Sequence, residues 1–244
     1  EVQDGAAVSP AISDLAPGAH QVTALSSGDP HFESDQTTLT QNVAKIGTTT
    51  GLVVSPTSST YGDPLDLTAT VVPSQNGLSA PTGSVDFMDG STTLATVPLA
   101  ASGGNGTAHV VLNDLGAGTH SIKAVYAGTP NFEGSSSAPK AISIAKRATA
   151  VKAEPAVVKL LPLGLPLGRL QVKVSSTLGP LVGVPVTFTI GSKTVGTSTT
   201  DINGVASVNA SSQLVQLVLA GGYTATFDGN ANFEGSSGHG AILQ

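Results

Sequence analysis

The chain of 244 residues repeats one short motif at the spacing of a whole domain. The motif reads SSGDPHFES at 26–34, YAGTPNFEGSS at 126–136 and FDGNANFEGSS at 227–237. Its phenylalanines are Phe32, Phe132 and Phe233, so the period is 100 and then 101 residues. A unit of that length is a domain rather than a solenoid repeat. The motif therefore predicts a tandem array of modules.

The middle module, residues 47–146, has the pattern of a two-sheet β-sandwich. Apolar and polar residues alternate in short segments, and turn residues separate these segments. Seven short antiparallel strands in about 100 residues are typical of an Ig-like architecture. We therefore predict an all-β fold with about seven strands in each complete module. The seven predicted strands are 49–54, 65–71, 84–88, 93–97, 106–112, 121–126 and 141–145.

The other two modules differ in how much of this pattern they repeat. Residues 147–244 follow the same order of strands and turns, and form a complete module. Residues 1–46 match only the back half, so the four front strands are missing. Half a sandwich leaves an apolar face and a strand edge uncovered. We expect either a preceding stretch of the natural chain to supply the front half, or another chain to do so by strand complementation.

Composition and charge exclude several kinds of site. There is no cysteine, hence no disulfide or thiolate chemistry. The net charge of −6 argues against nucleic-acid binding, which needs clustered basic residues. No run of 18 apolar residues predicts a membrane span, and no basic start followed by an apolar stretch predicts a signal peptide. The charge is uneven: residues 1–146 hold 12 acidic and 4 basic side chains, and residues 147–244 hold 4 and 6.

Two segments of the last module are unusually apolar. Residues 160–168 replace the polar turn of the middle module, and residues 213–219 lie in a predicted connection between strands. Either both cover the end of their own sandwich, or they form an exposed patch that packs on a neighbour. In the second case the assembly interface would consist of Leu160, Leu161, Leu163, Leu165 and Leu167.

Four motifs in order resemble those of the bacterial Ig-like repeat domains of secreted and cell-surface proteins. They are Tyr61-Gly62-Asp63-Pro64 before an alternating strand, the stretch 81–87 followed by Asp89-Gly90, Leu115 with Gly118-Thr119-His120, and the stretch 128–132. The resemblance implies a β-sandwich, an extracellular or cell-surface location, and a role as spacer, stalk or adhesive module. It implies no enzymatic activity and no cofactor.

The residues themselves predict no catalytic, cofactor or metal site. The polar residues of the repeated motif differ between copies, so we interpret the motif as a turn that Phe32, Phe132 and Phe233 anchor. His20 and His120 occupy one repeat position, which indicates a structural role. The stretch 228–232 offers oxygen ligands for calcium, but only one of them is a carboxylate, so turn chemistry is the better interpretation.

Three functions remain open. The first is a non-catalytic spacer, because a linker as short as 145–148 predicts a semi-rigid rod of modules. The alternative is a subunit of an extracellular filament or sheath, assembled by strand complementation or head-to-tail packing. A second alternative is an adhesin or glycan-binding module. The expected partners are neighbouring Ig-like modules or copies of the chain, and no specific ligand is predicted.

Overall fold

The computed structural model describes residues 6–75, 79–158 and 168–243. The chain forms two compact units. The first consists of Glu1–Val54, Asp66–Val110 and Ser121–Lys140, and the second of Ser55–Leu65, Val111–His120 and Ala141–Gln244. The second unit thus holds the last module together with three segments of the middle module, 55–65, 111–120 and 141–146.

The middle module has two sheets, as predicted. One sheet has the strand order β4-β12-β10-β6-β7, with β11 paired to β10, and the other has the order β3-β5-β9-β8. All registers described within them are antiparallel except that of β4 with β12, which is parallel. The strands are β3 (Thr48–Ser55), β4 (Ser58–Thr60), β5 (Leu65–Pro73), β6 (Ser84–Asp89), β7 (Thr92–Pro98), β8 (Ala100–Ser102), β9 (Asn105–Leu112), β10 (Gly118–Tyr126), β11 (Ser135–Ser136) and β12 (Lys140–Ala145).

Alternation along β5 and β10 builds the core of this module. Successive side chains of a strand point to opposite faces, so every second residue is buried. In β5 the inward residues from Leu65 to Val71 are at most 1% exposed, while Asp66 lies in solvent. In β10 the same alternation buries Ile122, Ala124 and Tyr126.

The last module repeats this plan. One sheet has the order β13-β15-β16, with β19 also paired to β15, and the other has the order β14-β21-β20-β17-β18. The hairpin of β17 and β18 shifts register after Phe188, as that of β6 and β7 does after Phe87. The strands are β13 (Thr149–Ala153), β14 (Ala156–Val157), β15 (Arg169–Ser176), β16 (Gly179–Pro180), β17 (Pro185–Ile190), β18 (Lys193–Thr199), β19 (Val205–Asn209), β20 (Gly222–Phe227) and β21 (Ser236–Leu243).

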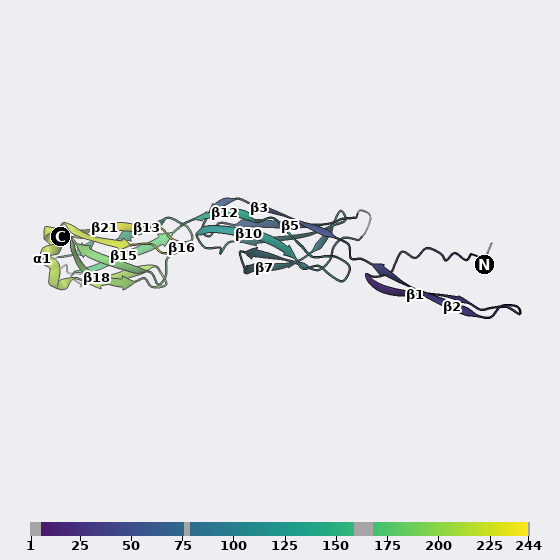
Figure 1. Ribbon diagram of the computed structural model, residues 1–244. Helices are drawn as coiled ribbons and strands as arrows, with labels where there is room; N and C mark the ends of the chain where they lie inside the picture. Colours follow the sequence, from purple (N-terminus) through teal and green to yellow (C-terminus); the bar gives the residue numbers. More distant parts are fainter. Residues whose placement is uncertain (1–5, 76–78, 159–167, 244) are drawn as a thin grey trace. The chain divides into compact units, whose positions relative to one another are not determined.

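A short helix stands where the sequence analysis predicted only a connection. After the 3-10 turn η1 (Ser211–Gln213), helix α1 (Leu214–Leu219) joins β19 to β20. It lies at the end of the last module that also holds the C-terminus (Figure 1). Leu217 is fully buried and Leu214 packs against the core, so the helix covers part of the sandwich end. With six residues, it is too short for a 3.6-residue period to show in the sequence.

In the described part of the first module, residues 6–46, the structure has a two-stranded hairpin rather than three strands. Strand β1 (Gly18–Ser26) pairs with β2 (Asp35–Val43) along their whole length, with Val22 opposite Leu39. Figure 1 shows this hairpin in purple. The β10 residues at the repeat positions of Val22 and Ala24 are fully buried, yet Val22 is 47% exposed and Leu39 67%. Val22 and Leu39 therefore lie uncovered on one face of this hairpin.

Candidate functional site: the repeated turn and the Arg147 junction

The repeated motif folds into one tight turn in all three copies. In the first copy, the Asp29 side chain accepts backbone N–H bonds from His31 and Phe32, at 2.7 and 2.9 Å. Thr129 and Asn230 make the equivalent bonds in the other copies. Asp, Thr and Asn thus supply the same oxygen acceptor, which is the usual chemistry of Asx and Ser/Thr turns. All three copies keep this side-chain oxygen acceptor, but backbone N–H groups of the turn itself occupy it.

Each turn requires glycine at the position before the residue that supplies the side-chain oxygen. Gly28, Gly128 and Gly229 all have positive φ, between 72° and 87°. A Cβ at Gly128 would lie 2.7 Å from the carbonyl oxygen of Phe132. Any side chain there would be strained and would also collide with the turn. The glycine is therefore a structural part of each turn.

The three phenylalanines differ in their surroundings. Phe132 is 3% exposed and pairs by a parallel bridge with Ile46. Phe233 is half-buried against the core of the last module and pairs in the same way with Arg147. Phe32, in the first copy, is 74% exposed. In the second and third copies, the turn thus pairs with the residue that links its own module to the preceding one.

At the second of these linkers, Arg147 holds several groups of the second unit. Its Nε–H donates to the backbone oxygen of Tyr61, and Nη1 donates to Thr177 Oγ1 at 2.6 Å. Nη2 donates to a carboxylate oxygen of Asp63 and forms an ion pair with it. The Arg147 side chain is only 12% exposed. A planar guanidinium with several fixed donors suits such simultaneous bonding better than a lysine would.

The backbone of Arg147 is also bonded on both sides. Its N–H donates to the Asn232 carbonyl, and its own carbonyl accepts from Glu234 N–H, both at 2.9 Å. The linker between β12 and β13 is therefore paired as an extended segment with the repeated turn of the last module. A linker held in this way has no free backbone rotation while these bonds last.

Three further contacts surround Arg147. The rings of Tyr61 and Phe233 meet edge to face, with centroids 5.4 Å apart, an arrangement that aromatic pairs prefer. The N–H of Ala117 donates to Asn232 Oδ1 at 3.0 Å. A Cβ at Gly62 would lie 2.5 Å from the end of the Leu178 side chain, and the φ of +86° at Gly62 also favours glycine. We call this group the Arg147 junction: Tyr61, Gly62, Asp63, Ala117, Arg147, Thr177, Leu178, Asn232 and Phe233.

The electrostatics of the junction depend on Asp63. The hydrogen bond from Arg147 is the largest influence, and it holds the pKa of the Asp63 carboxyl below its ordinary value of 3.8. A bond from Thr60 N–H to the same carboxylate acts in the same direction. Asp63 is therefore ionised at neutral pH, as the pair with Arg147 requires.

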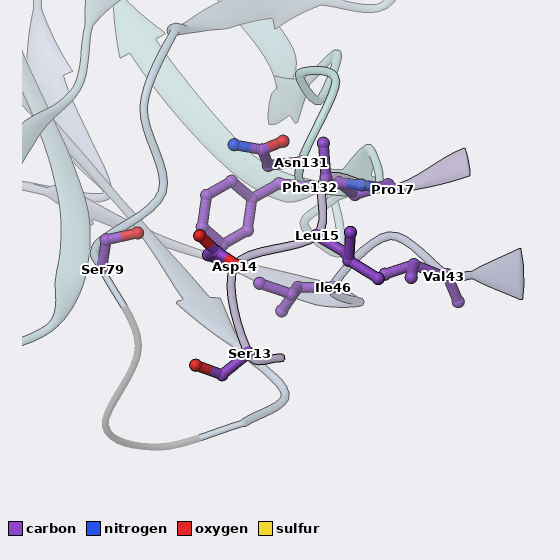
Figure 2. Close-up of a pocket in the computed structure, with 11 residues that line it drawn as sticks. Ser13, Asp14, Leu15, Pro17, Val43, Ile46, Ser79, Asn131 and Phe132 are labelled. Atoms are coloured by element: carbon purple, nitrogen blue, oxygen red, sulfur yellow. The ribbon is translucent and has the colours of Figure 1, made fainter. Parts of the chain in front are cut away.

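In the first unit, the repeated turn of the middle module borders a cavity of about 410 Å³. The residues before β1 line one side of it, and Asn131 and Phe132 line the other. Figure 2 shows Asp14, Leu15 and Ile46 around the Phe132 ring. The Ile46 backbone is bonded to Asn131 and Glu133 just as Arg147 is bonded to Asn232 and Glu234. The same contact is therefore built twice, once around Ile46 and once around Arg147.

The remaining predicted residues fall as follows. Leu160, Leu161, Leu163, Leu165 and Leu167 lie outside the described residues. His20 and His120 bond the carbonyls of Ala16 and Gly116, four residues earlier in each copy. In the stretch considered for calcium, Asn230 and Asn232 use their side-chain oxygens on backbone N–H groups. Among the described residues no three His, Asp or Glu side chains gather as metal ligands.

Sequence reasoning missed Arg147 as the centre of the junction. Its partners Tyr61, Asp63 and Thr177 are distant in sequence, and no short motif connects them. One signal was present: Arg147 takes the repeat position of the apolar Ile46. A charged residue that replaces a packed one needs specific partners.

The strand order, the alternating burial and the parallel edge pairs define the chain as an all-β protein of Ig-like sandwiches. Residues 52–145 match the family described as bacterial Ig-like domain, group 3. The resemblance predicted from the sequence is thus confirmed for the middle module. No curated protein matches the chain.

Several solved structures are similar to it. The fibronectin(III)-like modules of Clostridium thermocellum CbhA have 15% identity and a TM-score of 0.28, covering 79% of this chain and 94% of that one. A 1.5-MDa bacterial ice-binding adhesin has 14% identity and a TM-score of 0.31, covering 92% and 74%. The Yersinia pseudotuberculosis adhesin InvE has 19% identity and a TM-score of 0.35, covering 80% and 59%. None of the helices in the described ranges has the length and apolarity needed to cross a membrane.

Proposed function

We propose that the chain is a structural segment of a bacterial extracellular or cell-surface protein, in which Ig-like modules form a semi-rigid rod. The observation that carries this proposal is the Arg147 junction. The linker is bonded through its backbone to the repeated turn, and through its side chain to Tyr61, Asp63 and Thr177. A spacer needs such linkers, because a flexible one would let successive modules fold back on each other.

Small-angle X-ray scattering of the purified chain tests the rod. We expect one conformation of the linker between β12 and β13 to fit the data. An Arg147→Gly variant should need an ensemble of bent conformations. A wild-type chain that already needs such an ensemble would refute the proposal.

The uncovered face of the β1–β2 hairpin supports a second candidate, assembly by strand complementation. Val22 and Leu39 lie opposite each other and are exposed, and an isolated two-stranded hairpin is marginal in water. We propose that front strands from elsewhere, supplied by the same polypeptide or by a second chain, cover this face. A second chain as the source would make assembly the function.

Amide hydrogen exchange distinguishes these two sources. In the purified chain, the β1 and β2 amides should exchange fast at every protein concentration if the strands normally come from the same polypeptide. Protection that grows with concentration would identify a second chain as the source, because only association depends on concentration.

A further inference from the structure

Helix α1 has an apolar outer face. Val215, Val218 and Leu219 are 69%, 43% and 83% exposed. Their spacing of three and four residues places them on one side of the helix. Together with Leu214 they line a shallow depression of about 300 Å³. Leu217 and Leu214 already pack into the core of the last module, so the outward-facing residues of α1 are not needed to cover this sandwich.

The repeat shows what such a connection contacts in the other modules. The segment before β1 lies against the repeated turn at Asn131 and Phe132. The segment between β9 and β10 lies against the next repeated turn, where Ala117 bonds Asn232. Helix α1 occupies the same place in the last module, between β19 and β20. It is therefore the third copy of a connection that twice receives a repeated turn.

The chain also holds a third copy of the turn. The turn at Asp29–Phe32 has the same internal hydrogen bonds as the two buried copies. Its phenylalanine is exposed, whereas Phe132 is buried and Phe233 half-buried. Among the described residues, the turn at Asp29–Phe32 makes only its internal backbone bonds, and no backbone bond joins α1 to a repeated turn.

We propose that α1 is a docking surface for the repeated turn of a second copy of this chain, with Phe32 inserted against Val215, Val218 and Leu219. Charge favours this pairing. The turn carries Asp29 and Glu33, and residues 1–146 are net acidic by 12 to 4. Arg169 begins β15 opposite Asn209, which precedes η1, and residues 147–244 hold 6 basic side chains against 4 acidic. Opposite charges at unlike ends guide a head-to-tail contact.

The contact joins two different surfaces, so each chain can bind one neighbour at each end. Contacts of this heterologous kind leave a free surface at each end, so they extend into open chains unless the rotation between copies closes a ring. The proposal goes beyond the rod, because a chain with a flexible Arg147 linker would still carry both surfaces.

Sedimentation of the purified chain tests it at concentrations up to about 1 mM, where contacts of this small size become populated. We expect the weight-average mass to rise with concentration, and to rise less at high salt. Phe32→Ala and the double variant Val215→Asp/Leu219→Asp should each weaken association at least about tenfold, the loss of one buried apolar anchor. Ile202→Asp is the matched control, since Ile202 is also an exposed apolar residue, at 78%.

Mixing the two variants gives the sharpest result. The Phe32→Ala chain keeps α1, and the α1 double variant keeps Phe32, so an equimolar mixture should form dimers and stop there. Association that Phe32→Ala leaves unchanged, or a wild-type chain that remains monomeric throughout, would overturn the proposal. Because Phe32 is exposed, its removal does not disturb the fold, and the test stands even if the helix variant unfolds.

Discussion

Removing the Arg147 side chain should loosen the linker without unfolding the modules. Arg147→Ala deletes the bonds to Tyr61 O and Thr177 Oγ1, together with the pair with Asp63. Hydrogen bonds that involve a charged donor contribute about 1.5 to 3 kcal/mol each when they are protected from water. We count only the bond to Tyr61, at the low end of that range, because the bonds to Thr177 and Asp63 are exposed to solvent and add little.

This contribution is about 1.5 kcal/mol, which is a factor of about 12 in an equilibrium between a closed and an open junction. The cores of the two modules are unchanged, because Arg147 belongs to neither set of buried apolar residues. The expected result is therefore a change in linker conformation, with little change in the unfolding temperature of either sandwich.

Distance measurement between two spin labels provides the assay. The chain has no cysteine, so cysteines introduced at the exposed Ser102 and Lys193 are the only labelling sites. The distance distribution should be narrow in the wild type and broad in Arg147→Ala. Lys146→Ala is the matched control, because it removes the same charge from the exposed neighbouring residue. A distribution equally narrow in Arg147→Ala would show that the side chain does not hold the linker.

Three further predictions concern the junction carboxylate, the repeated turn and the core of the last module. The pKa of Asp63 is lowered in the folded chain, so its contribution is present above the ordinary value of 3.8 and is lost as the pH falls below it. Because this pair is exposed and adds little, the spin-label distribution should broaden only slightly in that range, and Asp63→Asn should give the same slightly broadened distribution at every pH. Gly128→Ala places a Cβ against Phe132 O at positive φ and should cost about 2 kcal/mol or more of unfolding free energy. Gly103→Ala is the control, because Gly103 also has positive φ but no atom lies within 4 Å, and it should cost only about 1 kcal/mol. Equal losses of unfolding free energy in urea titration would contradict a collision at Gly128. Tyr223→Phe removes a buried hydroxyl that bonds Glu154 O and Gln171, and it should cost about 1 to 3 kcal/mol of unfolding free energy. Burial raises the pKa of Tyr223 above 10.0, so the wild type should also lose stability as the pH rises past 10.0. Calorimetry should show this loss to be steeper in the wild type than in the variant.

The strands could be predicted from sequence because their information is local. In β5 the alternation from Leu65 to Val71 fixes both the strand and its buried face, and the structure confirms both. The short strands β4, β8 and β11 were missed. Two or three residues show no period, and their pairing depends on the neighbouring strand alone.

The contacts of the candidate site were much harder to predict from the sequence. Phe32, Phe132 and Phe233 have the same local sequence, yet their exposures differ because of the module that precedes each turn. Helix α1 was visible only as an apolar segment, since the split between inward Leu217 and outward Leu219 follows from the helix geometry. Arg147 bonds Tyr61, which is 86 residues away in sequence. A single sequence carries no pattern that pairs such positions.

The two linkers show how one repeated contact can carry different chemistry. Backbone pairing with the turn is the same at Ile46 and at Arg147, and so is the bond from the following threonine, Thr48 or Thr149, to the turn. The side chains differ: Ile46 contributes an apolar surface beside Phe132, and Arg147 a guanidinium with three separate partners. Apolar contact has no direction, whereas hydrogen bonds from a planar group fix an orientation. Within an array of similar modules, we therefore expect the residue at this one position to set how firmly each linker is held.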